Sequence, residues 1–227
     1  MTAGPLAAGQ LVTGKFITLE GGEGAGKSTV LATLREALET AGVEVAVTRE
    51  PGSTPAGEAI RHIVLHPDYK GLCVETELLL MFAARAQLVR ERIQPALAAG
   101  QWVLSDRYTD ASYAYQGGGR GQPAERIADL ERWAIDGLRP DLTILLDLPV
   151  AQGLARVGSR GDGADRIEQE RIEFFERVRG AYLARAAAEP ARFRVIDASR
   201  QLAAVLDDVR AAAAEFLALH LPRSVVP

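Results

Sequence analysis

The sequence has one cysteine, no long apolar run and no excess of positive charge, and each shortage excludes a class of protein or site. Cys73 is the only cysteine among 227 residues, so an intramolecular disulfide is impossible and no zinc site built on thiolates is suggested. No apolar stretch approaches the ~20 residues that a membrane-spanning helix needs. The formal net charge of -4 argues against a general surface for a nucleic-acid polymer. We therefore expect a cytoplasmic protein without a membrane or nucleic-acid partner.

The chain is long enough for one domain with a substantial core. Residues 1–14 are small and weakly polar and lack the charged and then apolar pattern of a secretion signal, so we expect a loose leader there. The single domain is predicted over 15–221, with a short tail at 222–227.

Apolar strand patterns alternate with helical patterns along the whole domain. Strands are predicted at 16–20, 44–48, 102–105, 142–148 and 193–197. Helices are predicted at 27–41, 55–65, 75–99, 123–137, 168–188 and 201–219. Continuous apolar strands of this kind indicate a doubly wound α/β fold, with a mainly parallel five-stranded sheet covered by helices on both faces. Two glycine-rich stretches interrupt the pattern: a tract at 116–121, predicted to be mobile, and a charged segment at about 157–167, predicted to be a closing lid.

A phosphate-binding loop lies between the first strand and the first helix. Gly21, Gly26, Lys27 and Ser28 fit the pattern G-x-x-x-x-G-K-[ST]. Such a loop points successive backbone N–H groups at phosphates, and the following helix adds its positive N-terminal end. Lys27 can reach the β- and γ-phosphates, and Ser28 can ligate Mg²⁺. The loop therefore predicts a nucleoside triphosphate with magnesium, without indicating what receives the phosphoryl group.

Charged residues follow the next two strands, at the sheet edge where ligands bind in this class of fold. Arg49 ends the second strand and can hold an acceptor phosphate by paired hydrogen bonds, or it can be a surface arginine paired with Glu50. Asp106 and Arg107 end the third strand; a carboxylate and a guanidinium there suit magnesium and phosphate, although a structural salt bridge is the alternative.

The combination resembles the thymidylate kinase family, in particular its bacterial kind. The resemblance rests on motifs that occur in order over nearly all of residues 16–200: the loop 20–29, TREPG at 48–52, ELLLMFAARAQL at 77–88, DRY at 106–108, YQGGGRG at 115–121, RPDLT at 139–143, LD at 146–147, DRIEQ at 165–169 and IDA at 196–198. It implies a P-loop nucleoside monophosphate kinase fold and transfer of the ATP γ-phosphoryl group to thymidine monophosphate (dTMP). It also implies Mg²⁺ as the cofactor and a homodimer.

Site residues follow from the matched positions. The resemblance implies that ATP is bound by the loop and by residues that close over or line the nucleotide: Gly21, Gly22, Glu23, Gly24, Ala25, Gly26, Lys27, Ser28, Thr29, Arg156, Arg160, Asp197 and Ala198. For dTMP it implies Glu23 at the 3′-hydroxyl, Arg49 and Arg107 at the phosphate, Arg85 and Gln116 at the base, Tyr115 at the 2′ position, and a contact from Ser112. Metal ligation is expected from Ser28 and Asp106, and catalytic roles from Lys27, Asp106, Arg107 and Arg160.

The chain departs from many relatives at the position whose side chain stacks on the thymine base. Many relatives carry a phenylalanine four residues before the matched arginine, where this chain has Met81 followed by Phe82. Neighbouring helical side chains diverge by ~100°. Either Phe82 stacks on the base after a small adjustment, or Met81 offers a softer platform, or both are core residues. We expect base contact from this face and include both residues in the dTMP site.

The arginines that close over the phosphates and stabilise their charge are expected in the lid, because the phosphate loop contains no arginine. Arg156, Arg160 and Arg166 fit that arrangement. A different small-molecule kinase of the same fold is the nearest alternative function. A GTP-dependent switch is a further alternative, but no convincing Asn-Lys-x-Asp segment for guanine is present.

Replacing Arg160 by alanine tests the lid. We expect turnover to fall about tenfold or more, with a smaller effect on dTMP binding, because the guanidinium stabilises charge that develops during transfer. Steady-state kinetics and dTMP binding measured on the purified variant check this. Unchanged turnover would reject the role of Arg160.

Overall fold

The computed structural model describes residues 14–158 and 165–221. Apart from Gly14, the predicted leader and tail lie outside the described residues, so the domain boundaries stay predictions. Within the described part of the chain, no helix is both long enough and apolar enough to cross a membrane.

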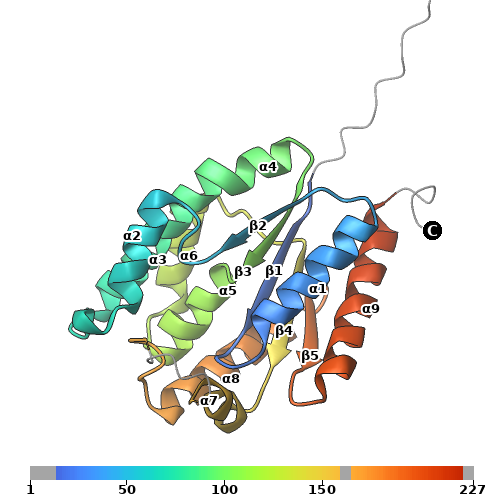
Figure 1. Cartoon of the computed structure of the whole chain (residues 1–227). Coiled ribbons are helices and arrows are strands. Elements are labelled where there is room, and N and C mark those ends of the chain that lie inside the picture. The colour runs from blue at the N-terminus through green and yellow to red at the C-terminus, as the bar shows by residue number, and fades with distance from the viewer. Residues whose placement is uncertain (1–13, 159–164, 222–227) are drawn as a thin grey trace, which may run out of the picture.

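A five-stranded, all-parallel sheet forms the centre, as predicted. Its strands are β1 (Phe16–Gly21), β2 (Val45–Arg49), β3 (Trp102–Asp106), β4 (Leu142–Asp147) and β5 (Phe193–Asp197). Their spatial order is β2-β3-β1-β4-β5, so β1 lies in the middle. Register pairs Leu19 with Asp106, and Asp106 with Arg49, which brings three strand ends to one edge. Figure 1 shows the helices arranged around this sheet.

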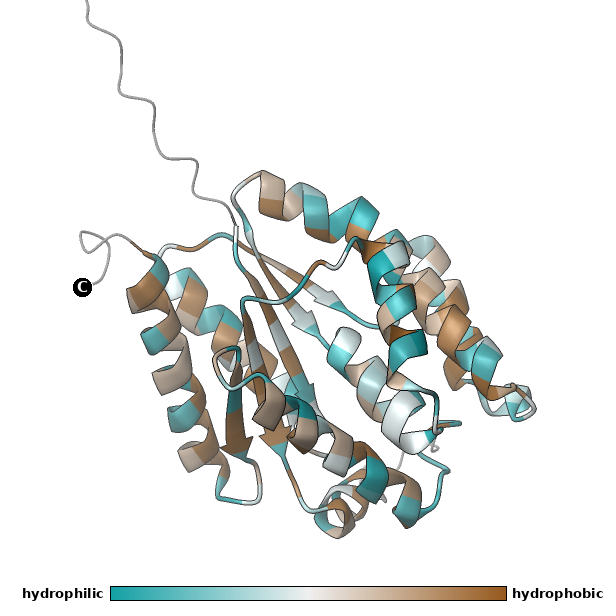
Figure 2. Ribbon diagram, turned by 180° about the vertical axis from the view of Figure 1, so that it is seen from behind, coloured by the Kyte–Doolittle hydropathy of each residue, from teal (hydrophilic) through white to brown (hydrophobic). Residues whose placement is uncertain are grey.

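Helices cover both faces, because successive residues of each strand point to opposite sides. Ile17 and Leu19 pack with helices α1 (Lys27–Thr40) and α9 (Leu202–His220), which lie side by side in Figure 1. Phe16 and Val103 pack on the other face. That face is covered by α3 (Val74–Leu88), α6 (Ala124–Ile135) and α8 (Ile172–Ala188). The central strands are predominantly hydrophobic in Figure 2, as a sheet buried on both faces requires.

The remaining elements connect these layers. They are α2 (Pro55–Leu65), the short 3₁₀ turn η1 (Pro67–Tyr69), the π-helical turn η2 (Val89–Ile93), α4 (Gln94–Ala98), α5 (Thr109–Ser112), the π-helical segment η3 (Tyr113–Gly119) and α7 (Val150–Gly158). The side chain of Thr54 accepts a hydrogen bond from the N–H of Gly57, and Pro55 follows it, so α2 begins where its sequence predicts.

Two predicted helices differ from the structure, and one helix of the structure was not predicted. The predicted helix 75–99 is divided by η2, because Pro95 lacks an N–H and its ring crowds the carbonyl one turn earlier. The predicted helix 168–188 begins only at Ile172, because the Asp165 carboxylate accepts hydrogen bonds from the N–H groups of Ile167 and Glu168 and holds a separate turn. Helix α7 was not among the predicted helices.

The glycine tract 116–121 was predicted to be mobile, and this is wrong. Most of it belongs to η3, which packs along α8. Arg177 of α8 donates hydrogen bonds to the carbonyls of Gly118 and Gly119. A Cβ atom on Gly118 would lie 2.6 Å from Ala181 Cβ and 2.8 Å from the Arg177 carbonyl oxygen. These glycines therefore permit close packing of two helical segments.

Replacing Gly118 by alanine is expected to lower the free energy of unfolding by about 1–3 kcal/mol, because the added methyl group meets backbone that must move. Gly180→Ala is the matched control, since Gly180 lies in α8 with open space around its Cβ position. Urea denaturation of both variants measures the difference. Equal stability of the two variants would show that the packing tolerates the extra carbon.

Candidate active site

The phosphate loop joins β1 to α1 at the carboxyl edge of the sheet. Gly24 has φ 70°, and a Cβ there would lie 2.2 Å from the carbonyl oxygen of Gly153 in α7, so this position needs glycine. The ammonium of Lys27 donates hydrogen bonds to the carbonyls of Gly21 and Gly22, at 3.2 and 3.0 Å. Burial lowers the pKa of Lys27, and the charge of Arg107 lowers it further. The loop thus folds with its lysine across it, beside a second cation.

Arg107 connects this loop to the neighbouring strand end. Its guanidinium donates hydrogen bonds to the Gly21 carbonyl at 3.1 Å and to Glu23 Oε1 at 2.7 Å. Tyr115 also donates to Glu23 Oε1, at 2.8 Å, and its ring lies 4.8 Å from the guanidinium carbon of Arg107. Arg107 has φ 68°, a left-handed conformation that is uncommon for a residue other than glycine. Its ion pair is therefore with Glu23, and not with the adjacent Asp106.

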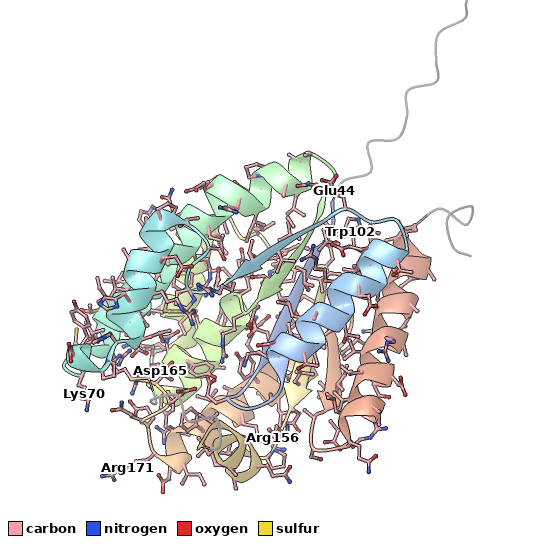
Figure 3. The ribbon with its side chains drawn as sticks, viewed as in Figure 1. Glu44, Lys70, Trp102, Arg156, Asp165 and Arg171 are labelled. Atoms are coloured by element: carbon pink, nitrogen blue, oxygen red, sulfur yellow. The ribbon has the colours of Figure 1, made fainter. Side chains whose placement is uncertain are left out.

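A cavity with about 600 Å³ of atom-free space opens beside this cluster. Five residues of the predicted dTMP site line it: Glu23, Met81, Arg107, Tyr115 and Gln116. Asp165 also lines the cavity. In Figure 3, Asp165 and Arg156 lie toward the end of the molecule where the strands finish, and Trp102, where β3 begins, lies toward the opposite end. The cavity therefore lies at the sheet edge that the motifs predicted.

Two acceptor atoms of the cavity residues have no hydrogen-bond partner in the described part of the chain. They are Gln116 Oε1 and Glu50 Oε1, and both are buried. Buried polar atoms normally have partners, so these two acceptors, on residues that line the cavity, are candidates for donors from a ligand or water.

Met81, and not Phe82, lines the cavity. Phe82 is buried in the cluster around Phe16 and Tyr108, with the guanidinium carbon of Arg85 4.6 Å from its ring centre. Of these two neighbouring residues, Met81 therefore reaches the cavity, and the structure gives Phe82 a core position.

Arg85 is fully buried behind the cavity and does not line it. It donates hydrogen bonds to Glu50 Oε2 at 2.7 Å, to the Ser112 hydroxyl at 2.9 Å and to the Tyr108 carbonyl at 3.0 Å. Burial raises the pKa of Glu50, while the charge of Arg85 lowers it. Because Glu50 pairs with Arg85, the alternative pairing of Arg49 with Glu50 is wrong.

Arg49 lies instead in a second, more open hollow. Its guanidinium donates to Glu58 Oε1 and Oε2, at 2.9 and 3.0 Å, and its side chain is about half exposed. Ser28 and Asp106 line the same hollow. Asp106 Oδ1 is buried there without a partner in the described part of the chain. A buried carboxylate oxygen and a hydroxyl at one hollow are ligands that suit a hard cation such as Mg²⁺.

Of the predicted ATP residues outside the loop, Arg156 contacts the loop directly. Arg156 of α7 donates hydrogen bonds to the Gly24 carbonyl at 3.3 Å and to the Ala198 carbonyl at 3.2 Å. It therefore joins the loop to the segment after β5, where Asp197 accepts hydrogen bonds from Ser199. Arg160 lies outside the described residues.

Arg166 does not face the phosphate loop, as a lid arginine would. It is buried, donating to the Val64 carbonyl at 2.6 Å and to Glu77 Oε2 at 2.6 Å. The sequence pattern could not show this, because Glu77 lies 89 positions away.

The cavity wall also contains residues that the sequence analysis did not identify as site residues, among them Glu50, Pro51, Arg61 and Asp165. Glu50 and Pro51 fall inside the TREPG motif, so this motif could have identified them as site residues. Arg61 donates a hydrogen bond to the Pro51 carbonyl at 3.0 Å and adds a second cation to the wall. It lies within an ordinary amphipathic helix, which gives no sign of its position.

Glu20 is a buried carboxyl group at the end of β1. It accepts hydrogen bonds from the Tyr108 N–H and the Tyr182 hydroxyl, each at 2.7 Å. Burial and the nearby Asp110 carboxylate raise the pKa of Glu20 to about 8. The Tyr182 hydroxyl also lies 3.3 Å from the Arg107 guanidinium, so Glu20 supports that arginine indirectly.

The raised pKa of Glu20 makes a prediction about stability. Folding favours the protonated form, so its contribution is complete below the unfolded pKa near 4.5 and is lost as pH rises to about 8. Relative to Glu20→Gln, the free energy of unfolding of the wild type should fall by up to ~1.4 kcal/mol per pH unit over that interval. Above about pH 8 the difference between the two proteins should no longer change with pH. Denaturation of both proteins between about pH 5 and pH 9 measures this difference. Parallel stability profiles would contradict the assignment.

Comparison with known proteins agrees with this geometry. The sequence profile of the thymidylate kinase family matches residues 19–209. A thymidylate kinase from Halorhodospira halophila is 55% identical over 205 residues, covering 90% of this chain and 95% of the relative. Those from Pseudomonas syringae pv. tomato and Chromohalobacter salexigens are 58% and 56% identical, covering 86% and 92% of this chain and 92% and 99% of the relatives. The chain therefore belongs to the thymidylate kinase family.

Proposed function

We propose that this member of the thymidylate kinase family transfers the γ-phosphoryl group of ATP to dTMP, giving ADP and dTDP for dTTP synthesis. ATP occupies the loop Gly21–Thr29, and dTMP occupies the cavity beside it. The observation that carries the proposal is the position of Arg107, which contacts the loop carbonyl of Gly21 and also lines the cavity. Two phosphate groups, one from each site, can therefore meet at a single guanidinium.

The donor side needs positive charge and directed N–H groups. Lys27 now donates to two loop carbonyls, and it exchanges these partners for the β- and γ-phosphates when ATP binds. Arg156 already bridges the loop and the Ala198 carbonyl, where the adenine is expected. Asp197 and Ala198 complete that edge, and Arg160 adds charge from the lid.

The acceptor side orients dTMP. Arg107 and Arg61 supply cations at the cavity wall, and Arg49 stands at the neighbouring strand end. Glu23 is placed to accept from the 3′-hydroxyl, and Tyr115, bonded to Glu23, occupies the space that a 2′-hydroxyl would need. Met81 and Gln116 meet the base, while Arg85 and Ser112 support that wall from behind.

Ser28 and Asp106 are the residues that would hold Mg²⁺, and Asp106 Oδ1, which is buried without a partner among the described residues, supports this assignment. When bound, the ion supplies neutralisation of phosphate charge. The protein contributes alignment of the dTMP phosphate oxygen with the γ-phosphorus and exclusion of water. The monophosphate is largely ionised at neutral pH, so no strong general base is required.

A homodimer is also proposed, through the face formed by α3 and α6. Leu79 of α3 and Trp133 of α6 are 56% and 81% exposed, which is unusual for such large apolar side chains on two helices in contact. A second copy of this chain would bury them. The cytoplasm remains the proposed location.

Two measurements test the proposed function: the rate of ADP release by the wild type with different nucleoside monophosphates as acceptors, and the activity of Lys27→Ala with dTMP. We expect the wild type to release ADP from ATP fastest with dTMP among the common nucleoside monophosphates. Lys27→Ala should lose about 100-fold or more of that activity, because the charge on the transferred group is no longer stabilised. Lys70→Ala is the matched control, since Lys70 is exposed and far from the loop in sequence. Near-normal turnover of Lys27→Ala, or no preference for dTMP in the wild type, would refute the proposal.

A further inference from the structure

A buried ionic network lies directly behind the cavity and centres on Glu77 of α3. Glu77 Oε1 accepts hydrogen bonds from Gln116 Nε2 at 3.0 Å and from Arg120 Nε at 3.2 Å. Glu77 Oε2 is 2.6 Å from Arg166 Nη2 and 3.2 Å from Arg120 Nη2. Only 1% of Glu77 is exposed, and Glu77 is not one of the residues that line the cavity.

The surroundings of Glu77 keep it ionised. Burial acts to raise its pKa, but the hydrogen bond from Gln116, the charge of Arg120 and the hydrogen bond from Arg166 together lower it below the ordinary value. An ionised carboxylate can only accept hydrogen bonds. Every group that faces Glu77 in this network is accordingly an N–H donor.

This chemistry fixes the orientation of the Gln116 amide. The two ends of a glutamine amide have nearly the same shape, so packing alone does not decide which end points where. Turning the amide over would place its carbonyl oxygen against the Glu77 carboxylate and lose a charge-assisted hydrogen bond. The NH₂ group therefore faces Glu77, and Oε1, at the other end of the amide of this cavity-lining residue, is left buried without a partner in the described part of the chain.

We propose that Glu77 is a positioning residue for base specificity: by holding the NH₂ of Gln116, it makes the cavity present a hydrogen-bond acceptor to the base. This inference rests on the proposed function, in which the pyrimidine of the acceptor nucleotide lies against Gln116. Thymine and uracil carry an N–H at ring position 3 and satisfy that acceptor. Cytosine has an unprotonated nitrogen there, so two acceptors would face each other in a buried site, which is costly.

Glu77→Gln is the direct test. At the position of Oε2 the new NH₂ group would meet two donors, Arg166 Nη2 at 2.6 Å and Arg120 Nη2 at 3.2 Å. At the position of Oε1 it would meet Gln116 and only one arginine donor, Arg120 Nε at 3.2 Å, so it is expected there. The Gln116 amide then turns over to accept from it and presents NH₂ to the cavity. We expect the ratio of kcat/KM for dTMP to that for dCMP to fall about tenfold or more, mainly through KM.

Two further variants separate positioning from structure. Glu75→Gln removes a charge from the same helix, at an exposed residue whose carboxylate is 3.4 Å from Gln122 Nε2, and should leave the ratio unchanged. The exchanged pair Glu77→Gln with Gln116→Glu keeps the net charge of the network. Its residue 116 again offers an acceptor to the cavity, so the preference for dTMP over dCMP should recover in part. Thermal unfolding of each variant reports whether the fold is retained.

The outcomes distinguish the two proposals. If the wild type does not prefer dTMP, the proposed function fails. If the wild type prefers dTMP but folded Glu77→Gln keeps the same ratio of dTMP to dCMP, the positioning role alone is overturned. If Glu77→Gln does not fold, the exchanged pair decides: a recovered preference supports the role, whereas an absent preference, or failure of this variant to fold as well, rejects it.

Discussion

The fold and the site depend together on the contacts of Arg107 at the end of β3. Its hydrogen bonds to the Gly21 carbonyl and to Glu23 tie the strand end to the phosphate loop, across the register that pairs Leu19 with Asp106. Because β1 and β3 are parallel neighbours, their carboxyl ends coincide, and a guanidinium on one can reach the backbone of the other. The left-handed backbone of Arg107 is held by these surroundings. Without this contact, the loop and the cavity would be adjacent but not joined.

Much of this arrangement could be predicted from the chain alone. The five strands follow from apolar runs, and the loop follows from glycine spacing before Lys27 and Ser28. The edge at which Arg49, Asp106 and Arg107 gather follows from parallel strands ending together. These features are local in sequence or set by a simple topological rule, so they can be recognised from the sequence without a structure.

The rest depended on packing between distant segments, which a sequence pattern does not reveal. Met81 and Phe82 were both candidates because helical spacing alone does not show how α3 is rotated; the structure turns Phe82 toward Phe16. The glycines at 117–119 suggested mobility, yet their small size lets η3 lie close to α8. The buried partners of Glu77 come from positions 116, 120 and 166, and only the folded chain brings them together.

The close approach of Gly24 and Gly153 restricts how this enzyme can change. A Cβ at position 24 would lie 2.2 Å from the carbonyl oxygen of Gly153, and a Cβ at position 153 would lie 2.4 Å from the carbonyl oxygen of Glu23. Neither residue can gain a single carbon unless the other backbone retreats. The two segments are therefore packed without spare room, so the backbone at the start of α7 limits the positions that the peptide groups of the loop at Glu23 and Gly24 can take.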